Sequence, residues 1–217
     1  MLYRDAMVLV IDKPAGLPVH GGPAGGPNLE AGLEALRFGA KDLPSLAHRL
    51  DRDTSGCLAL GRGEKGIKRL GRMFREGLVG KIYWAVVEGG PTEDAGVIDA
   101  PLEKVNSPDG WRIEVRPEGK PAVTHWRVLG RSQGEGQGRA WIEFRPETGR
   151  THQVRVHAAL LGCPIVGDVQ YGAADAGLPL HLLARALTLP LYLDRPPVSV
   201  EAEPPEFMAA ALKLLGR

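Results

Sequence analysis

Runs of apolar residues, separated by turns rich in Gly and Pro, set the pattern of this chain. β-branched and apolar residues fill residues 7–11, before a break at residue 12, and again residues 81–88. Runs of this kind, roughly four to eight residues long and bounded by turn residues, are typical of strands. We expect further strands at residues 57–60, 97–102, 111–115, 122–129, 140–145, 186–192 and 198–200, with turns at Asp109-Gly110 and within residues 134–138.

Fewer segments show helical spacing. Between residues 64 and 76, apolar side chains share one face and basic side chains occupy the other. Further helices are expected over residues 29–38, where Asn28 can act as a cap, and over residues 152–161 and 205–215. Many strands and few helices predict an α+β fold with a large, mostly antiparallel sheet and flanking helices.

The composition is that of an ordinary globular protein. Of 217 residues, 43% are hydrophobic and 24% are charged, which argues against a disordered or fibrous protein. The chain shows no internal repeat or linker, so we expect a single domain over residues 1–217. It has no signal peptide and no apolar run long enough to cross a membrane, which predicts a cytoplasmic protein without a membrane partner. Cys57 and Cys163 lie in apolar segments and are expected in the core.

Charge is distributed unevenly along the chain. The net charge of +1 does not by itself point to a nucleic acid. Basic residues nevertheless dominate from Arg62 to Lys81, where only Glu64 and Glu76 oppose them. A local basic face can bind phosphates even on a neutral protein. The same residues also fit a solvated helix face, and charge alone leaves both interpretations open.

Three polar clusters interrupt the apolar pattern, at residues 13–22, 48–56 and 147–157. Loops held by a rigid scaffold commonly carry function. In the second cluster, Asp51 precedes a Thr-Ser-Gly turn and fits either a turn-capping carboxylate or a catalytic one. Arg49 and Arg52 flank it. Positive charge nearby keeps a carboxylate ionised and repels a divalent cation, so we expect no metal here.

Residues outside the second cluster also allow two interpretations. Tyr83 fits either a core aromatic residue or a ring that stacks on an unpaired base. Arg150 and Arg155 lie in the third cluster, and His152 can share a helix face with Arg155. A Thr-Gly-Arg turn that enters a helix presents backbone N–H groups and a guanidinium suited to phosphate. The structural alternative is an ion pair with a nearby glutamate.

Four ordered motifs give the sequence a family resemblance. The stretch His48-Arg49-Leu50-Asp51-Arg52-Asp53-Thr54-Ser55-Gly56 resembles the signature of the RluA-type pseudouridine synthases. Residues 12–20, 81–89 and 148–168 resemble, in the right order, the family's N-terminal motif, the strand with its active-site tyrosine, and its late motif.

The resemblance implies an RNA-modifying isomerase with a mixed sheet and a central active-site cleft. Asp51 is then the nucleophile, and Tyr83 stacks on the target base. Arg155 forms an ion pair with Asp51, and takes the flipped nucleotide's place in the stack or holds its phosphate. Further RNA contacts are expected from Arg49, Arg52, Arg150 and His152. No cofactor is implied, and the expected partner is ribosomal or transfer RNA, as a stem-loop bound by a monomer.

The implied reaction breaks the C1′–N bond of uridine, rotates the uracil and forms a C1′–C5 bond. The Asp51 carboxylate can attack C1′ or C6, or remove a proton from C2′, and the sequence leaves these routes open. The base must first leave its stack, at a cost of roughly a few kcal/mol.

Two features of the sequence depart from common family members. The first motif begins at Asp12, so we expect no S4-type RNA-binding domain, and Leu183 stands where a Leu-His-Ala triplet carries its His.

Overall fold

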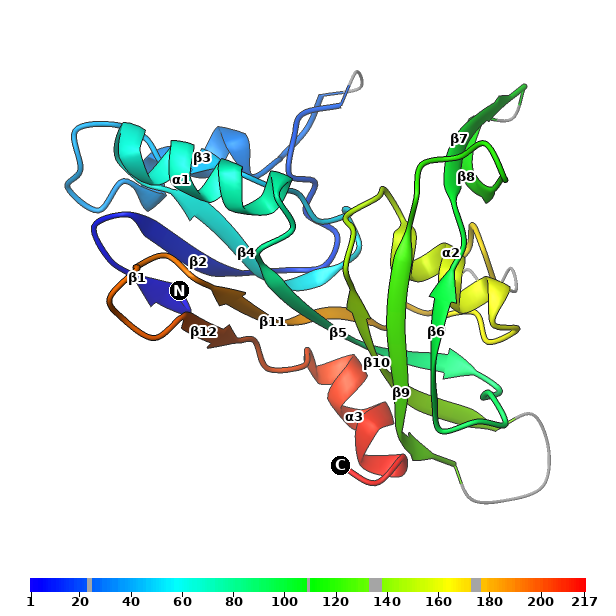
Figure 1. The fold of residues 1–217 in the computed structure, drawn as a ribbon. Helices are drawn as coiled ribbons and strands as arrows, with labels where there is room; N and C mark the ends of the chain where they lie inside the picture. The colour runs from blue at the N-terminus through cyan, green and yellow to red at the C-terminus, as the bar shows by residue number, and fades with distance from the viewer. Residues whose placement is uncertain (23–24, 109, 133–137, 173–176) are drawn as a thin grey trace. The chain divides into compact units, whose positions relative to one another are not determined.

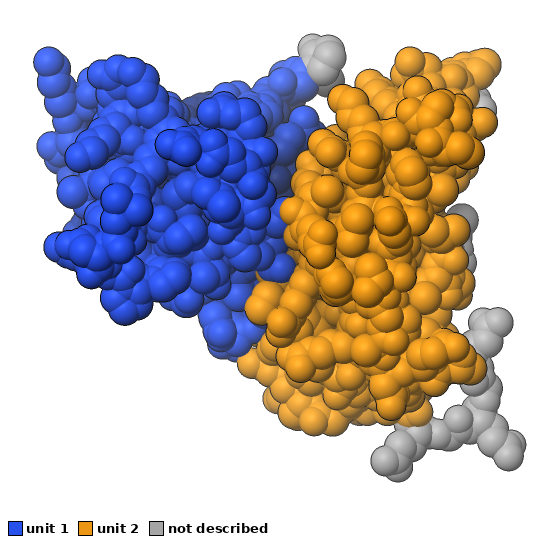
Figure 2. All heavy atoms as spheres, in the orientation of Figure 1, with its two compact units in different colours: residues 1–81, 184–203 blue, residues 82–183, 204–217 orange. Residues whose placement is uncertain are grey.

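The computed structural model describes residues 1–22, 25–108, 110–132, 138–172 and 177–217. The turns expected at Asp109-Gly110 and within residues 134–138 therefore lie largely outside the described residues. The chain divides into two compact units (Figure 2). Unit 1 contains residues 1–81 and 184–203, and unit 2 contains residues 82–183 and 204–217.

Unit 1 is a sheet with a helix packed against it. Its elements are β1 (Tyr3–Arg4), β2 (Val8–Lys13), the 3-10 helix η1 (Glu30–Leu36), β3 (Ser45–Leu46), β4 (Ser55–Gly61), α1 (Gly63–Arg75), most of β11 (Leu182–Leu189) and β12 (Val198–Glu201). Hydrogen bonding orders the strands β1-β2-β4-β11, with β3 paired to β4 and β12 paired to β11. The pairs β1–β2, β2–β4, β3–β4 and β11–β12 are antiparallel. All seven residues of β4 are buried, so this strand forms the centre of the unit.

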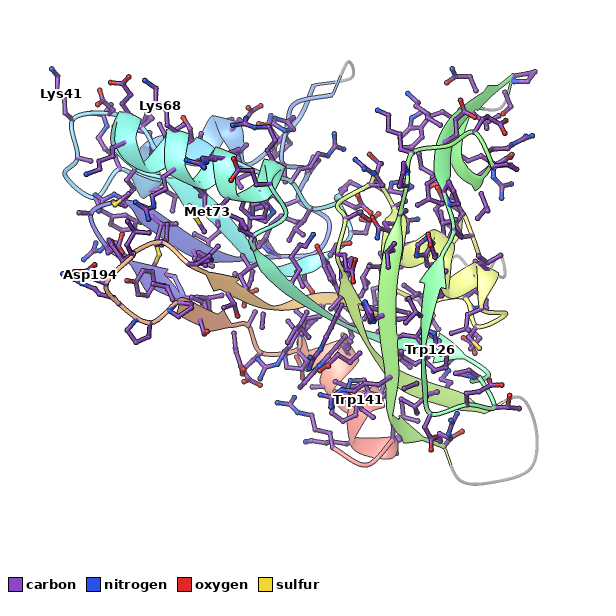
Figure 3. The ribbon with its side chains drawn as sticks, viewed as in Figure 1. Lys41, Lys68, Met73, Trp126, Trp141 and Asp194 are labelled. Carbon is purple, nitrogen blue, oxygen red and sulfur yellow. The ribbon has the colours of Figure 1, made fainter. Side chains whose placement is uncertain are left out.

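Helix α1 packs closely on the strands beneath it (Figure 1). Its buried face contains Gly66, Leu70 and Met73. A Cβ atom on Gly66 would lie 2.2 Å from the Met7 carbonyl oxygen, so only glycine allows this approach. In Figure 3 the Lys68 side chain lies on the outer side of the helix and Met73 lies on the side of the strands. The helix expected between residues 64 and 76, with apolar and basic faces, is present.

Unit 2 has an apolar core of its own. Its elements are most of β5 (Gly80–Glu88), β6 (Ala95–Asp99), β7 (Leu102–Ser107), β8 (Gly110–Val115), β9 (Val123–Arg131), β10 (Arg139–Pro146), α2 (Gln153–Leu160) and α3 (Glu206–Leu214). The strands β5-β10-β9-β6 lie in this order and pair antiparallel. Apolar residues of these strands pack with those of α2, as Ile142 and Phe144 do with Val154 and Ala158. Strands β7 and β8 form a separate antiparallel hairpin (Figure 1).

The α+β class, with a large and mostly antiparallel sheet and few helices, is confirmed. Several boundaries differ from the expectation. Strand β2 continues through Lys13, because the buried lysine ammonium finds acceptors there. Strand β11 ends at Leu189, because Pro190 cannot donate a backbone hydrogen bond. The segment expected as a helix over residues 29–38 is the shorter 3-10 helix η1, where Asn28 Oδ1 accepts the Ala31 N–H at 3.0 Å.

Strand β7 and its pairing with β8 were not expected from the sequence, because its residues are mostly polar and exposed. Cys57 and Cys163 are both buried and free, as predicted. Within the described residues, no helix is long and apolar enough to cross a membrane.

Candidate active site

Asp51 lies in a short turn that leads directly into β4. The Asp51 carbonyl oxygen accepts the Thr54 N–H at 3.2 Å, which closes the turn. Ser55 then begins the buried strand, and Gly56 adopts a φ of +106°, a conformation that favours glycine. The Thr-Ser-Gly sequence after Asp51 therefore anchors the turn to the centre of unit 1.

The Lys13 side chain supports this turn through hydrogen bonds. Its side chain is fully buried. The ammonium donates to the carbonyl oxygens of Pro14 at 2.8 Å, Leu17 at 2.9 Å and Arg52 at 2.8 Å. Burial lowers the pKa of Lys13 to about 8, while the carboxylates of Asp53 and Asp51 act in the opposite direction. The group therefore stays mostly protonated at neutral pH, as three donated hydrogen bonds require.

His48, at the start of the signature, has a structural environment. Its Nε2 accepts the Ala59 N–H at 2.9 Å, and its ring stacks on Phe74 with centroids 4.0 Å apart. A ring nitrogen that accepts a hydrogen bond carries no proton, so the imidazole is neutral. Burial, with a smaller effect of Lys81, lowers the pKa of His48 to about 3.

The two arginines that flank Asp51 differ in their contacts. Arg52 Nε donates to Asp53 Oδ1 at 3.1 Å, so its guanidinium is paired with the next residue along the chain. Both side chains of this pair are largely exposed, at 67% and 46%. Arg49 is exposed. Both positive charges were expected beside Asp51, whereas the Arg52 guanidinium is paired with Asp53.

Tyr83 belongs to unit 2 and lies on β5. It pairs with Phe144 of β10 and packs, partly buried, against the apolar cluster of this unit. Ala85 and Val87, which share its face of the strand, are fully buried in the same cluster. Val86, on the opposite face of β5, is also fully buried, and the partly buried Tyr83 ring lies at the border of the core.

Arg155, on α2, is fixed by Asp168. Arg155 Nε donates to Asp168 Oδ2 and a terminal nitrogen donates to Oδ1, both at 2.8 Å. The Asp168 side chain is 0% exposed, and its Oδ1 also accepts the N–H groups of Gln170 at 3.1 Å and Tyr171 at 3.2 Å. The Arg155 guanidinium lies over the Tyr171 ring, 5.1 Å from its centroid. Two parallel hydrogen bonds fix the orientation of the guanidinium plane. The ion pair expected between Arg155 and Asp51 involves residues of different units and stays a prediction.

Gln153 organises the turn that carries Arg150 and His152. Its Oε1 accepts the Thr148 hydroxyl at 2.8 Å and the Arg150 N–H at 2.9 Å. Arg150 Nε donates to the Pro121 carbonyl at 3.0 Å. His152, immediately before α2, has a φ of +52° and its Nδ1 lies 2.8 Å from the Tyr171 hydroxyl. The turn is thus held by buried amide contacts, and the expected RNA contacts of Arg150 and His152 stay predictions.

Two functional residues were missed by sequence reasoning. Lys13 and Asp168 both occur in the motifs described above, but neither received a role. A lysine that continues an apolar strand, and an acid that follows Gly167, are the signals that could have found them. In the described part of the chain, His, Cys, Asp and Glu form no group of three or more that could hold a metal ion.

Comparison with known proteins identifies the family. Residues 7–160 match the RNA pseudouridylate synthase family. The chain belongs to this family. It is 48% identical over 209 residues to an uncharacterized RNA pseudouridine synthase of Zymomonas mobilis, covering 95% of this chain and 94% of the relative. The family predicted from the four motifs is therefore confirmed, and the chain is an RNA pseudouridine synthase, an isomerase.

Other relatives are longer. An uncharacterized RNA pseudouridine synthase of Synechocystis is 36% identical over 82% of this chain, which spans 57% of that relative. Among solved structures, human RNA Pseudouridylate Synthase Domain Containing 4 matches with a TM-score of 0.80 and 29% identity. That match covers 99% of this chain and 92% of the human chain. The fold described here is therefore that of a pseudouridine synthase.

Proposed function

We propose that this pseudouridine synthase isomerises specific uridines in ribosomal RNA, transfer RNA or both, with Asp51 as the nucleophile on a flipped-out nucleotide. The observation that carries the proposal is the signature turn, in which the Asp51 carbonyl accepts a hydrogen bond from Thr54 just before the buried strand β4 and the Arg52 carbonyl accepts one from the buried Lys13. A catalytic carboxylate must be held in a fixed geometry, because small displacements of reacting groups strongly reduce rates.

Ribosomal RNA is the substrate to test first. A relative from Rickettsia felis, 38% identical over 79% of this chain, is named ribosomal large subunit pseudouridine synthase C, and the chain spans 55% of its length. The name describes that relative, and its transfer to this chain is part of the proposal. We keep a stem-loop as the expected form of the RNA.

Tyr83 and Arg155 complete the proposed catalytic set. A partly buried aromatic ring at the border of the core suits stacking on the extruded uracil. The fixed guanidinium of Arg155 suits the carboxylate of Asp51 or the phosphate of the flipped nucleotide. The same fixed orientation also lets it fill the space that the nucleotide leaves in the RNA stack.

Phosphate contacts are proposed for Arg49, Arg52, Arg150 and His152 and for the basic face of α1. On that face Lys68 pairs with Glu64 and Arg72 pairs with Glu76. Exposed pairs of this kind are weak, so they can open when phosphates approach.

We further propose that the two units act as one catalytic domain over residues 1–217 and that the chain works as a monomer. Analytical ultracentrifugation tests the second point. A cytoplasmic location also belongs to the proposal, and cell fractionation tests it, since two plant relatives carry mitochondrial names.

The deciding experiment measures pseudouridine formation in the presence of a chelator. We expect activity in ribosomal RNA from a strain that lacks the gene, and loss of activity in Asp51→Asn. The same substitution at the exposed Asp42 should leave activity unchanged. Full activity of the Asp51→Asn protein would refute the assignment of the nucleophile. Mapping pseudouridine in total RNA of the deletion strain and its parent identifies the target uridine.

A further inference from the structure

The hairpin β7–β8 of unit 2 carries a large aromatic side chain at its surface. Trp111, in β8, is 41% exposed. It lies opposite Asn106 of β7, and the hairpin is a separate sheet from the one that contains β5 and Tyr83 (Figure 1). Exposed tryptophan is uncommon because the ring carries a large apolar area, and it frequently marks a binding surface.

The Trp111 ring rests on a rigid support. It stacks on the His152 ring, with centroids 5.1 Å apart and planes 27° from parallel. His152 Nδ1 lies 2.8 Å from the Tyr171 hydroxyl, which also accepts the Ile113 N–H at 3.0 Å. The Gln170 side-chain amide donates to the Trp111 carbonyl at 2.9 Å. The indole therefore stacks on a ring that Tyr171 holds, while Gln170 and Tyr171 hold the backbone on either side of it.

His152 reaches this position through a strained backbone. Its φ of +52° is unusual for a residue with a Cβ and is energetically unfavourable. The left-handed conformation is the one in which the ring meets both Trp111 and Tyr171. Such strain is typically retained where a site needs it.

Cations accompany the aromatic rings. The Lys104 ammonium lies 4.8 Å from the Trp111 ring centroid, and the Arg112 guanidinium lies 5.9 Å from that of Tyr171. Glu114 offsets part of this charge, because it pairs with Arg112 and with Arg116. Aromatic rings for bases, next to cations for phosphates, are the combination by which proteins bind single-stranded nucleic acid.

We propose that Trp111 is a stacking platform for an unpaired nucleobase of the RNA substrate, other than the isomerised uridine, with Lys104 at an adjacent phosphate. This proposal rests on the proposed function of the chain as an enzyme acting on RNA. The platform connects to the catalytic set through Tyr171, whose hydroxyl binds His152 and whose ring supports the Arg155 guanidinium. RNA bound at Trp111 therefore contacts the same side-chain network that fixes Arg155.

The test measures RNA affinity, so it does not depend on turnover. Fluorescence anisotropy with a labelled 12-nucleotide oligouridylate and a hairpin RNA with a uridine loop gives Kd. We expect Trp111→Ala to weaken binding about 10-fold and Trp111→Phe to stay within about threefold, since stacking needs an aromatic ring. Val115→Ala, which shortens another exposed apolar side chain of β8, is the matched control and should change nothing.

Salt dependence separates the two roles. Lys104→Gln should reduce the slope of log Kd against log salt by about one, whereas Trp111→Ala should leave that slope unchanged. Abasic nucleotides introduced one at a time into the RNA loop give a test on the unaltered protein. One position should lose about 10-fold in affinity, and the loss should disappear in the Trp111→Ala background.

Three outcomes would overturn the proposal that Trp111 is a stacking platform. They are wild-type affinity in Trp111→Ala, no sensitive abasic position, or an abasic loss that persists without the indole. Failure of the wild-type protein to bind RNA at all would count against the proposed function itself. If polyglutamate bound the protein and Trp111→Ala abolished that binding while leaving the Kd for RNA unchanged, the surface would instead belong to an acidic protein partner.

Discussion

Replacing Lys13 by methionine tests whether the buried ammonium supports the fold and the catalytic turn. The substitution keeps the volume and removes the donor to three carbonyl oxygens. Hydrogen bonds to a charged group contribute about 1.5–3 kcal/mol each, which gives roughly 4–9 kcal/mol in total. Burial of the charged ammonium offsets part of this stabilisation. The lowering of its pKa from 10.5 to about 8 corresponds to a cost of about 3 kcal/mol for the charged form. We therefore expect Lys13→Met to lower the free energy of unfolding by about 3 kcal/mol.

The same variant should also impair catalysis. The Lys13–Arg52 hydrogen bond ties β2 to the residue that follows Asp51. Without it we expect kcat to fall at least about 10-fold, because the carboxylate is no longer held in position, while KM for RNA changes little. Urea unfolding measures the first effect. Release of tritium from C5-labelled uridine, which must leave when the C1′–C5 bond forms, measures the second.

The matched control is Lys41→Met, because Lys41 is exposed (Figure 3). We expect it to change the free energy of unfolding by no more than about 0.5 kcal/mol and to leave kcat unchanged. If Lys13→Met unfolded at the same urea concentration as the wild type and isomerised uridine at the same rate, the supporting role of the ammonium would be refuted.

Three other predictions concern pH, packing and the Arg155 site. Folding lowers the pKa of His48 from 6.5 to about 3, so below pH 6.5 the unfolded chain binds a proton that the folded chain does not. Lowering the pH from 7.5 to 5 should therefore reduce the free energy of unfolding by about 2 kcal/mol through His48 alone, as measured by thermal unfolding. Gly66→Ala should destabilise by more than about 2 kcal/mol in urea, whereas Gly71→Ala, with nothing within 4 Å of the added Cβ, should stabilise α1 by up to about 1 kcal/mol. Asp168→Asn breaks a buried ion pair and should cost about 3 kcal/mol of stability in urea unfolding and lower single-turnover rates about 10-fold.

Controls for these predictions are available in the same chain. His48→Gln keeps an acceptor for the Ala59 N–H without titrating, so the part of the pH dependence due to His48 should vanish in that variant. Equal effects of the two glycine substitutions would contradict the close packing of α1. A wild-type rate for Asp168→Asn would show that the Arg155 guanidinium is positioned by other groups.

The sequence predicted the strands where burial follows from local pattern. The run at residues 81–88 became β5, because a continuous apolar run of this length, buried on both faces at residues 85–87, is visible in its own sequence. Lys13 could not be predicted in the same way. Its burial depends on the carbonyl of Arg52, which lies 39 residues further along the chain, and hydrophobic pattern assigns a lysine to the surface.

The site was located by its motifs, but its supporting contacts were not. The signature placed Asp51 just before a turn that enters a strand, and Asp51 lies in the turn that precedes β4. The partner of Arg155 required the fold, because Asp168 reaches it only after the chain turns beyond the end of α2. The strand that contains Trp111 was expected, but the surroundings of its ring were not. Its neighbour Lys104 lies on a hairpin strand whose polar residues give no strand signal.

The division of the chain constrains how the protein can be made. The chain leaves unit 1 within β5 and returns to it within β11, about a hundred residues later. While the ribosome is still synthesising the intervening segment, β4 has its neighbour β2 but lacks β11, and one edge of a strand with seven buried residues stays open. Open apolar edges invite pairing with other chains. The first 81 residues therefore lack β11 and β12, and unit 1 can be completed only after residues 184–203 have been synthesised.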